Sequence, residues 1–315
     1  MANLRVVRPA TPTTLSRLVE DYLVACRARG LSPKTRDAYA YPLRAVFLPF
    51  CAKEGIREPD QLSSRVLDRL STKLLDEGGP KGELSKYSVH TYLRPINQFI
   101  AWAQREAGVG IRAKAQLPRR PRREVDVLDR EEIQRLEDAA SNARDKIIVR
   151  LLGDTGMRVG ELIGLRVADL LPNRGGRCEL RITGKGDHER TVPILPRVYQ
   201  RVKRYVERER PRDSRSPQLF LSLRRHPVTG QHEPLTESGV QQLLRAVAEV
   251  AGLDKRVHPH LLRHSFITHA AQRNMNPMKL QQIVGHNDLT MIARVYTHIQ
   301  ASDAHEDMVR LLTEP

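Results

Sequence analysis

The side chains that could carry out chemistry in this chain of 315 residues fall in five short segments. In the first, residues 155–162, Gly156 can form a turn that places Arg158 in the first turn of a helix. The amino end of a helix favours anions, so backbone amides and a guanidinium can meet there on one phosphate. Taken alone, a solvent-exposed arginine is the commoner interpretation.

The second candidate is Lys185, at the tip of a predicted hairpin between Gly184 and Gly186. A glycine on each side lets the backbone approach a partner closely, and the lysine can contact a base edge or supply a proton. The segment has neither the spacing nor the Ser or Thr of a phosphate-binding Walker loop. An ordinary polar turn is the alternative interpretation.

The third segment combines an arginine with several histidines, and Pro259 predicts that a helix begins there. His260 and Arg263 are three residues apart, so they share a helical face and can both donate to a phosphoryl oxygen. His258 and His264 add the alternative of a metal site. The acid between the histidines of an HExxH pattern is missing, so we predict no metal.

The last two segments supply a histidine and a tyrosine. Gly285 is predicted to cap a helix, leaving His286 on the following loop, and Tyr296 follows ten residues later. Each of these two residues is a weak signal of function by itself, because most tyrosines and histidines are structural. All six residues together suit metal-free phosphoryl transfer, with a tyrosine nucleophile and guanidinium groups on the nonbridging oxygens.

The charge of the chain also indicates a polyanionic partner. It carries 53 Lys and Arg against 37 Asp and Glu, a net charge of +16. Residues 111–123 hold six basic side chains and no acidic one, and their prolines disfavour a helix, so we predict a basic interdomain linker over residues 109–124. A merely solvated connector is the alternative. The candidate DNA contacts there are Arg112, Lys114, Arg119, Arg120, Arg122 and Arg123.

The linker separates two regions of different pattern. The pattern of residues 12–108 predicts four helices. The first has an apolar stripe from Leu15 to Leu23, and the second is kinked or split by Pro42 and Pro49. The pattern of residues 125–315 is mainly helical, and the first helix is predicted to begin after an Asp129 cap. Two strands are predicted near 178–183 and 190–194. The proline-rich stretch 207–234 is predicted to be irregular. The fold class is therefore mainly α with a small β-hairpin.

Other classes of protein are disfavoured. No apolar run reaches the ~18 residues of a membrane span, and the first 14 residues lack the apolar centre of a signal peptide. Cys26, Cys51 and Cys178 are odd in number and widely spaced, so neither a disulfide framework nor a zinc site is indicated. We expect a cytoplasmic protein.

Four stretches together resemble the tyrosine recombinase (phage integrase) family, and its Xer-like members in particular. They are TGMRVGEL around Arg158, GKGDHERTVPI around Lys185, HPHLLRHSFITH around His260 and Arg263, and VGHNDLTMIARVYTHI around His286 and Tyr296. They occur in the family's order and at its ordinary spacing, and the resemblance covers nearly the whole chain.

The resemblance implies a role for each residue. Tyr296 would attack the scissile phosphate, giving a 3′-phosphotyrosine and a free 5′-hydroxyl, while Arg158 and Arg263 hold the nonbridging oxygens. Lys185 would be the general acid, His260 would assist proton transfer, and His286 would hydrogen-bond the phosphate and buttress the site. The bond energy stays in the protein–DNA link, so no metal, ATP or other cofactor is implied.

The resemblance also implies an architecture and an assembly. Residues 12–108 would form a SAM-like core-binding domain and residues 125–315 the catalytic domain, joined into a C-shaped clamp around duplex DNA. A homotetramer on two recombination sites, or an assembly with a related recombinase, would pass through a Holliday junction. A short tail helix around Met308, Leu311 and Leu312 would pack on its own domain or on a neighbouring protomer.

Two rival functions stay open at this stage. A type IB topoisomerase uses a similar set of residues but would relax supercoils without joining two sites. A catalytically silent DNA-binding protein could share the fold, although all six positions are intact. The sequence does not name the target DNA, any accessory factor, or the biological role among chromosome resolution, plasmid resolution, integration and transposition of a mobile element.

Overall fold

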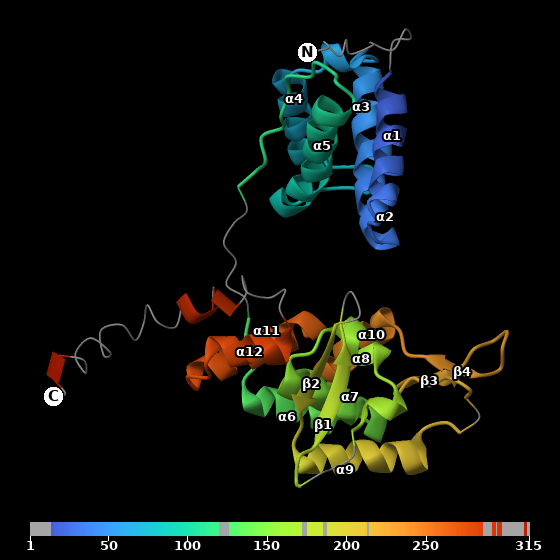
Figure 1. The fold of residues 1–315 in the computed structure, drawn as a ribbon, viewed down its shortest axis with the longest axis vertical. Helices are drawn as coiled ribbons and strands as arrows, with labels where there is room; N and C mark the ends of the chain where they lie inside the picture. The colour runs from blue at the N-terminus through green and yellow to red at the C-terminus, as the bar shows by residue number, and fades with distance from the viewer. Residues whose placement is uncertain are drawn as a thin grey trace, which may run out of the picture. The chain divides into compact units, whose positions relative to one another are not determined.

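A computed structural model gives the structure of the chain, which divides into two compact units, Met1–Arg123 and Glu124–Pro315. Figure 1 shows the helices and strands of both units. None of the helices that the structure describes is long and apolar enough to cross a membrane. The described residues are 14–119, 126–171, 175–184, 188–212, 214–285, 292–293, 295–297 and 312–313.

The first unit is helical, as predicted. Its main helices are α1 (Leu15–Ala28), α2 (Pro33–Pro42), α3 (Leu48–Lys53), α4 (Ser64–Asp76) and α5 (Lys86–Glu106). The predicted second helix is split, because a π-helical turn over Leu43–Phe47 separates α2 from α3. Hydroxyl side chains accept a backbone N–H at the first turn of four of these helices, and they belong to Thr14, Ser32, Ser63 and Ser85.

Part of the predicted linker packs onto this unit. Ile111, Ala113 and Ala115 are buried in its apolar core. The Asn97 side chain holds Ala115 by donating to its carbonyl and accepting from its N–H, at 2.9 and 2.8 Å. Arg112 and Lys114 alternate with the buried residues and are exposed. The packed backbone therefore presents both cations to solvent. Arg119 is also exposed, whereas Arg120, Arg122 and Arg123 lie outside the described residues.

The second unit is built around α7 (Ala143–Thr155), whose residues Ile147 to Leu152 are all buried. Helix α7 contacts α6, α8, α9 and α11. The other elements are α6 (Arg130–Ala139), α8 (Val159–Gly164), α9 (Pro196–Arg204), α10 (Glu237–Val250), α11 (Pro259–Gln272) and α12 (Pro277–Val284), with 3₁₀ and π turns at Val167–Asp169 and Tyr205–Glu209. Asp129 and Glu132 form the predicted capping box at α6.

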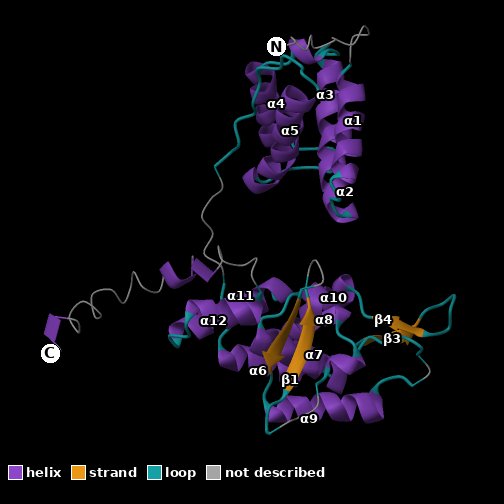
Figure 2. Ribbon diagram, in the orientation of Figure 1, coloured by secondary structure: helices purple, strands orange, loops and turns teal. Residues whose placement is uncertain are grey.

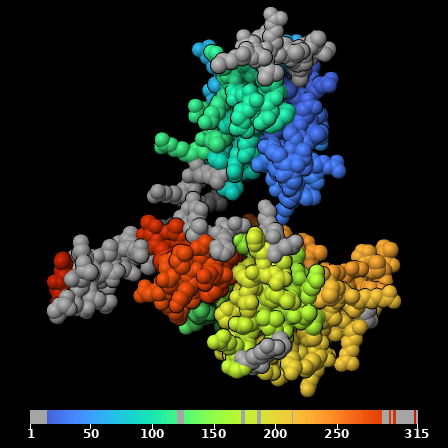
Figure 3. Space-filling model, in the orientation of Figure 1, coloured from blue at the N-terminus to red at the C-terminus, as the bar shows by residue number. Residues whose placement is uncertain are grey.

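Two small antiparallel sheets complete this unit (Figure 2). Strands β1 (Glu179–Thr183) and β2 (Glu189–Pro193) pair as the predicted hairpin, with Leu180 opposite Val192 and both buried. A second hairpin, β3 (Leu221–Arg225) with β4 (His232–Pro234), projects from the unit's edge (Figure 3). The prediction of an irregular stretch over 207–234 was therefore wrong for these strands. They are short, and Pro234 lies at a strand end, where proline is tolerated.

Candidate active site

Arg158 lies where α7 ends and α8 begins. Gly156 closes α7 in the left-handed conformation, with φ of 60°, and Arg158 is the N-cap residue of α8, one position before the predicted first turn. Its backbone N–H donates to Oε2 of Glu161 at 2.8 Å, and its Nη1 donates to Oε1 at 3.0 Å. One carboxylate thus fixes both the backbone and the side chain of Arg158.

Helix α11 carries His260 and Arg263, and it begins as predicted at Pro259. His258 is its N-cap residue, since its Nδ1 accepts the N–H of Leu261 at 3.2 Å. The alternative metal site is not supported in the described parts of the chain, where no three His, Cys, Asp or Glu side chains are grouped to hold an ion. Leu261 and Leu262 are buried in the core, as expected.

Arg263 has no solvent exposure at all. Its Nη1 donates to the carbonyl of Gly156, and its Nη2 donates to the carbonyl of Val284 at 2.6 Å. The guanidinium therefore joins the end of α7, next to Arg158, to the end of α12, next to Gly285. Such bonds fix its orientation before any ligand arrives.

The electrostatics of this cluster favour an anion. Burial, together with the charges of Arg158 and Arg190, lowers the pKa of Arg263 to about 9. Partial desolvation and the charges of Arg263 and Arg158 lower the pKa of His260 below its ordinary value, so its imidazole is neutral at pH 7. Arg158 and Arg190 both bind the carboxylate of Glu161, and the charges of all three residues act on Arg263. A bound anion would relieve the repulsion among the three guanidiniums.

Glu161 and Arg190 are members of the cluster that the sequence analysis did not single out. Arg190, in β2, donates to both oxygens of Glu161 at 2.9 and 2.8 Å. Both residues lie inside the quoted stretches TGMRVGEL and GKGDHERTVPI. The available signal was an acidic residue in the short helix after Arg158 and a basic residue in the second strand of the predicted hairpin. Only the fold shows that they meet.

Lys185 and His286 lie outside the described residues, but the glycines before them border the cluster. A Cβ added to Gly184 would lie 3.6 Å from Oε1 of Glu161. One added to Gly285 would lie 3.2 Å from Nη1 of Arg158. Gly285 is the C-cap of α12, as predicted, with φ of 97°. The chain therefore approaches the cluster closely just before each of these two predicted site residues.

Tyr296 lies in a helical segment that packs on α11 and α12 through Ile292 and Val295. Its hydroxyl donates to the carbonyl of Met275, and burial raises the pKa of the phenol. Met275 follows the C-terminal end of α11, which is about 14 Å along the helix axis from Arg263. The nucleophile predicted from the sequence is therefore bound to a backbone carbonyl at the opposite end of the helix that carries Arg263.

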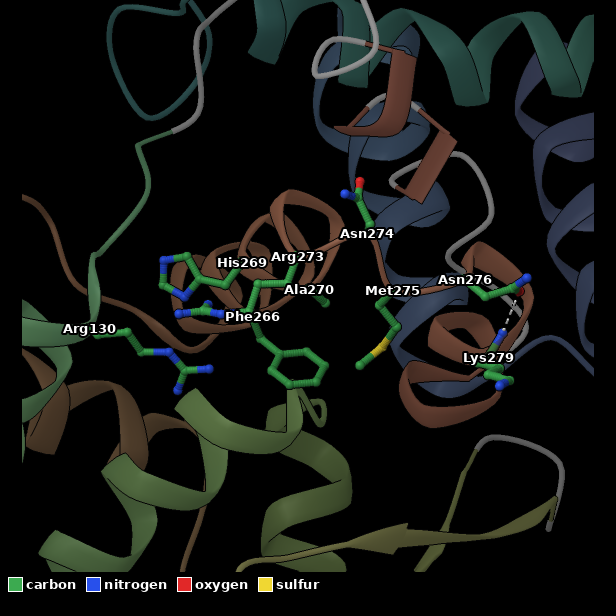
Figure 4. A pocket seen from close by; sticks show the side chains of 9 residues that line it. All are labelled: Arg130, Phe266, His269, Ala270, Arg273, Asn274, Met275, Asn276 and Lys279. Atoms are coloured by element: carbon green, nitrogen blue, oxygen red, sulfur yellow. Dashed lines mark hydrogen bonds between the residues drawn. The ribbon is translucent and has the colours of Figure 1, made fainter. Parts of the chain in front are cut away.

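Met275 also lines a cavity of about 490 Å³ at the end of α11. Figure 4 shows Arg130, His269 and Arg273 at one side of it, with Phe266 and Met275 beyond them. His269 is buried, and its Nδ1 has no hydrogen-bond partner among the described atoms. The residue that holds the Tyr296 hydroxyl is thus part of a cavity wall that is rich in cations.

Comparison with known proteins identifies the class of protein. A tyrosine recombinase XerD of Listeria monocytogenes is 28% identical over 296 residues, covering 90% of this chain and 95% of that protein. Tyrosine recombinase XerC 2 of Ralstonia nicotianae is 30% identical over 305 residues, covering 94% and 85%. A fold and site of this kind, with such relatives, define a tyrosine recombinase, an enzyme that cleaves and rejoins DNA.

The family follows from residues 126–303, which match the profile of the phage integrase family. The chain belongs to this family, as a Xer-like recombinase, and its activity is site-specific DNA recombination. Neither rival function is favoured by the comparisons.

Solved structures show the same fold. The Tn1549 transposon integrase, in complex with a circular intermediate DNA, gives a TM-score of 0.69 at 22% identity, covering 95% of this chain and 99% of that chain. The XerH site-specific recombinase bound to difH substrate gives 0.68 at 20% identity, covering 92% and 84%.

Proposed function

We propose that this recombinase cleaves DNA by transesterification to Tyr296. The Tyr296 oxygen attacks the scissile phosphorus, the bond from phosphorus to the 5′-oxygen breaks, and the products are a 3′-phosphotyrosine and a 5′-hydroxyl. The carrying observation is the cluster of Arg158, Arg190, Arg263 and neutral His260, in which Glu161 is the carboxylate that Arg158 and Arg190 bind. Such a site is short of negative charge, which a phosphodiester supplies.

The two arginines would hold the nonbridging oxygens of the phosphate. Arg158 is a third exposed, so part of its guanidinium can reach a ligand while Glu161 holds the rest. Arg263 is held rigidly by the carbonyls of Gly156 and Val284, and its lowered pKa would rise again beside a phosphate. His260, neutral and exposed, would accept the proton of the attacking tyrosine.

Lys185 would donate a proton to the departing 5′-oxygen, and His286 would donate a hydrogen bond to the phosphate. Both roles come from the family resemblance. Their support here is indirect, because Gly184 and Gly285 bring the chain to the edge of the cluster. A 5′-hydroxyl from a partner strand would reverse the attack and return the proton to Lys185.

Tyr296 must first leave the carbonyl of Met275. Its hydroxyl cannot attack phosphorus while its proton is donated to a backbone oxygen at the far end of α11. We propose that DNA binding or assembly breaks this hydrogen bond and that the helical segment around Tyr296 then delivers the hydroxyl.

Duplex DNA carrying a recombination site would be the substrate, and the basic linker would bind its phosphates through Arg112, Lys114 and Arg119. The first unit would act as a core-binding domain. A homotetramer on two sites, in the cytoplasm, would exchange strands through a Holliday junction. One solved structure of similar fold, a lambda integrase tetramer, is bound to such a junction, with a TM-score of 0.67 at 16% identity.

The test of this proposal is covalent capture on a nicked substrate, in which the short 5′-hydroxyl fragment diffuses away and prevents religation. The wild-type protein should form a complex that survives denaturation. Tyr296→Phe should form none while binding DNA as tightly as the wild type.

Tyr87→Phe is the matched control, because Tyr87 is an exposed tyrosine of the first unit. It should be captured like the wild-type protein. Capture that survives in Tyr296→Phe would assign the nucleophile to another residue and would contradict the proposal.

A further inference from the structure

Arg190 joins three elements of the catalytic unit through one buried side chain, which is 15% exposed. From β2 it donates through Nη1 and Nη2 to the two oxygens of Glu161 in α8, at 2.9 and 2.8 Å. Its Nε donates to the carbonyl of Ile283 in α12, at 2.8 Å. A planar guanidinium can make these three bonds at fixed angles, which an ammonium group cannot.

Each of the three elements lies close in sequence to a predicted site residue. Glu161 also binds Arg158, through its backbone and its side chain. Ile283 lies two residues before Gly285, and His286 follows. Strand β2 belongs to the hairpin that holds Lys185, whose neighbour Gly184 would place a Cβ 3.8 Å from Nη1 of Arg190.

The charge balance of the pair also depends on Arg190. Burial alone would raise the pKa of Glu161, but the hydrogen bonds from Arg190 and from the Arg158 backbone outweigh burial and lower it. Glu161 therefore stays ionised and available to Arg158. Without Arg190, the buried carboxylate would lose its bidentate partner, and Arg158 would be drawn toward it and away from a ligand.

We propose that Arg190 is a positioning residue for the strand-cleavage reaction: through Glu161 and the Ile283 carbonyl it sets the mutual placement of Arg158, the pair of strands β1 and β2, and the end of α12. Lys185 and His286 are close in sequence to the last two. This inference rests on the proposed function, since it assigns those residues to the scissile phosphate. The proposed role of Arg190 requires no contact with DNA, because it acts through the three bonds that its guanidinium makes within the protein.

The experiment compares Arg190→Met with the wild-type protein in single-turnover capture on the nicked substrate, at saturating protein. Displacing a catalytic group by about 1 Å costs on the order of 10²-fold in rate. We expect a fall of about that size in the capture rate, with the dissociation constant for DNA within twofold of the wild-type value. A change in rate without a change in binding identifies a defect of positioning.

Arg150→Met is the matched control. Arg150 is a buried arginine of the same unit, 9% exposed, and it pairs with Glu137 in α6, outside the cluster. Its loss should lower the unfolding temperature as much as the loss of Arg190, but it should leave the capture rate near that of the wild type. If the two variants lose capture equally, Arg190 is merely structural and the proposal is wrong.

Two further variants complete the design. Arg190→Lys keeps the charge but cannot bridge Glu161 and Ile283 together, so it should fold and still lose at least tenfold in rate. The double variant Arg190→Met with Glu161→Gln should be no slower than the slower single variant, because the two residues act as one unit. Capture at the wild-type rate by Arg190→Lys would overturn the proposal. Failure of the wild-type protein to be captured would instead contradict the proposed function.

Discussion

His260 and Tyr296 have pKa shifts in opposite directions, and both suit proton transfer at neutral pH. Desolvation and the charges of Arg263 and Arg158 lower the pKa of His260, and burial raises the pKa of Tyr296 above 10. The phenol therefore keeps its proton at pH 7, while the imidazole is free to accept one. General base catalysis requires this pairing of a protonated nucleophile with an unprotonated base.

The capture rate at limiting DNA should accordingly fall in acid as His260 becomes protonated. Because the pKa of His260 is lowered, the rate should hold from pH 8 down past the ordinary histidine value of about 6.5 and fall only below it. His260→Asn should lose about 10²-fold or more in rate and also lose this acid limb. Single-turnover capture between pH 5 and 8 measures both effects. A midpoint above 6.5 would contradict the assignment.

The sequence indicated the candidate site residues that carry recognisable chemistry and missed those that support them. Arg158, His260 and Arg263 were singled out because an arginine or a histidine at a helix start has a direct chemical meaning. Glu161 and Arg190 were missed because their function depends on a contact between residues 29 positions apart. The hydrogen bond from Tyr296 to Met275 was equally invisible, since it depends on how the last helical segment packs.

At the scale of elements, the junction between α7 and α8 is tightly constrained. Gly156 has φ of 60°, and a Cβ there would lie 2.5 Å from Cδ1 of Phe266 in α11. Its carbonyl also accepts a bond from Arg263. The turn before Arg158 thus requires glycine both for its conformation and for its packing.

Gly156→Ala should therefore destabilise the protein more than Gly230→Ala. Gly230 has nearly the same φ, 66°, but a Cβ there would have no atom within 4 Å, so it controls for backbone strain alone. Strain in this region costs about 1–3 kcal/mol, and overpacking adds about 1–3 kcal/mol at Gly156 only. Thermal unfolding should show Gly156→Ala several degrees below Gly230→Ala. Equal unfolding temperatures would mean that Phe266 moves aside freely.

Helices with caps were predictable, and irregular extended segments were not. Helix α5 is an example, because Ser85 caps its start and Gly108 follows its end. The hairpin of β3 and β4 was missed, since β4 has only three residues and too few to show a period of two. The burial of Ile111, Ala113 and Ala115 was not predicted, because the charged residues that alternate with them indicated only a basic linker.

At the scale of the whole molecule, the net charge of +16 predicts binding to DNA that depends strongly on salt. For six to ten phosphate contacts, raising salt from 50 to 200 mM should weaken binding about 10³-fold or more. Arg112→Gln with Lys114→Gln removes two exposed cations and leaves their buried neighbours in place. It should reduce the slope of log K against log salt by about 1.8. An unchanged slope would remove the linker from the DNA interface.

The central claim is that Tyr296 becomes joined to the 3′ side of a DNA break within a cluster of guanidinium groups. Mass spectrometry of the captured complex, after digestion of both protein and DNA, tests it directly. We predict a nucleotide attached through a 3′-phosphate to the peptide that contains Tyr296, and a free 5′-hydroxyl on the other fragment. A nucleotide attached to a different residue, or joined through its 5′-phosphate, would contradict the account.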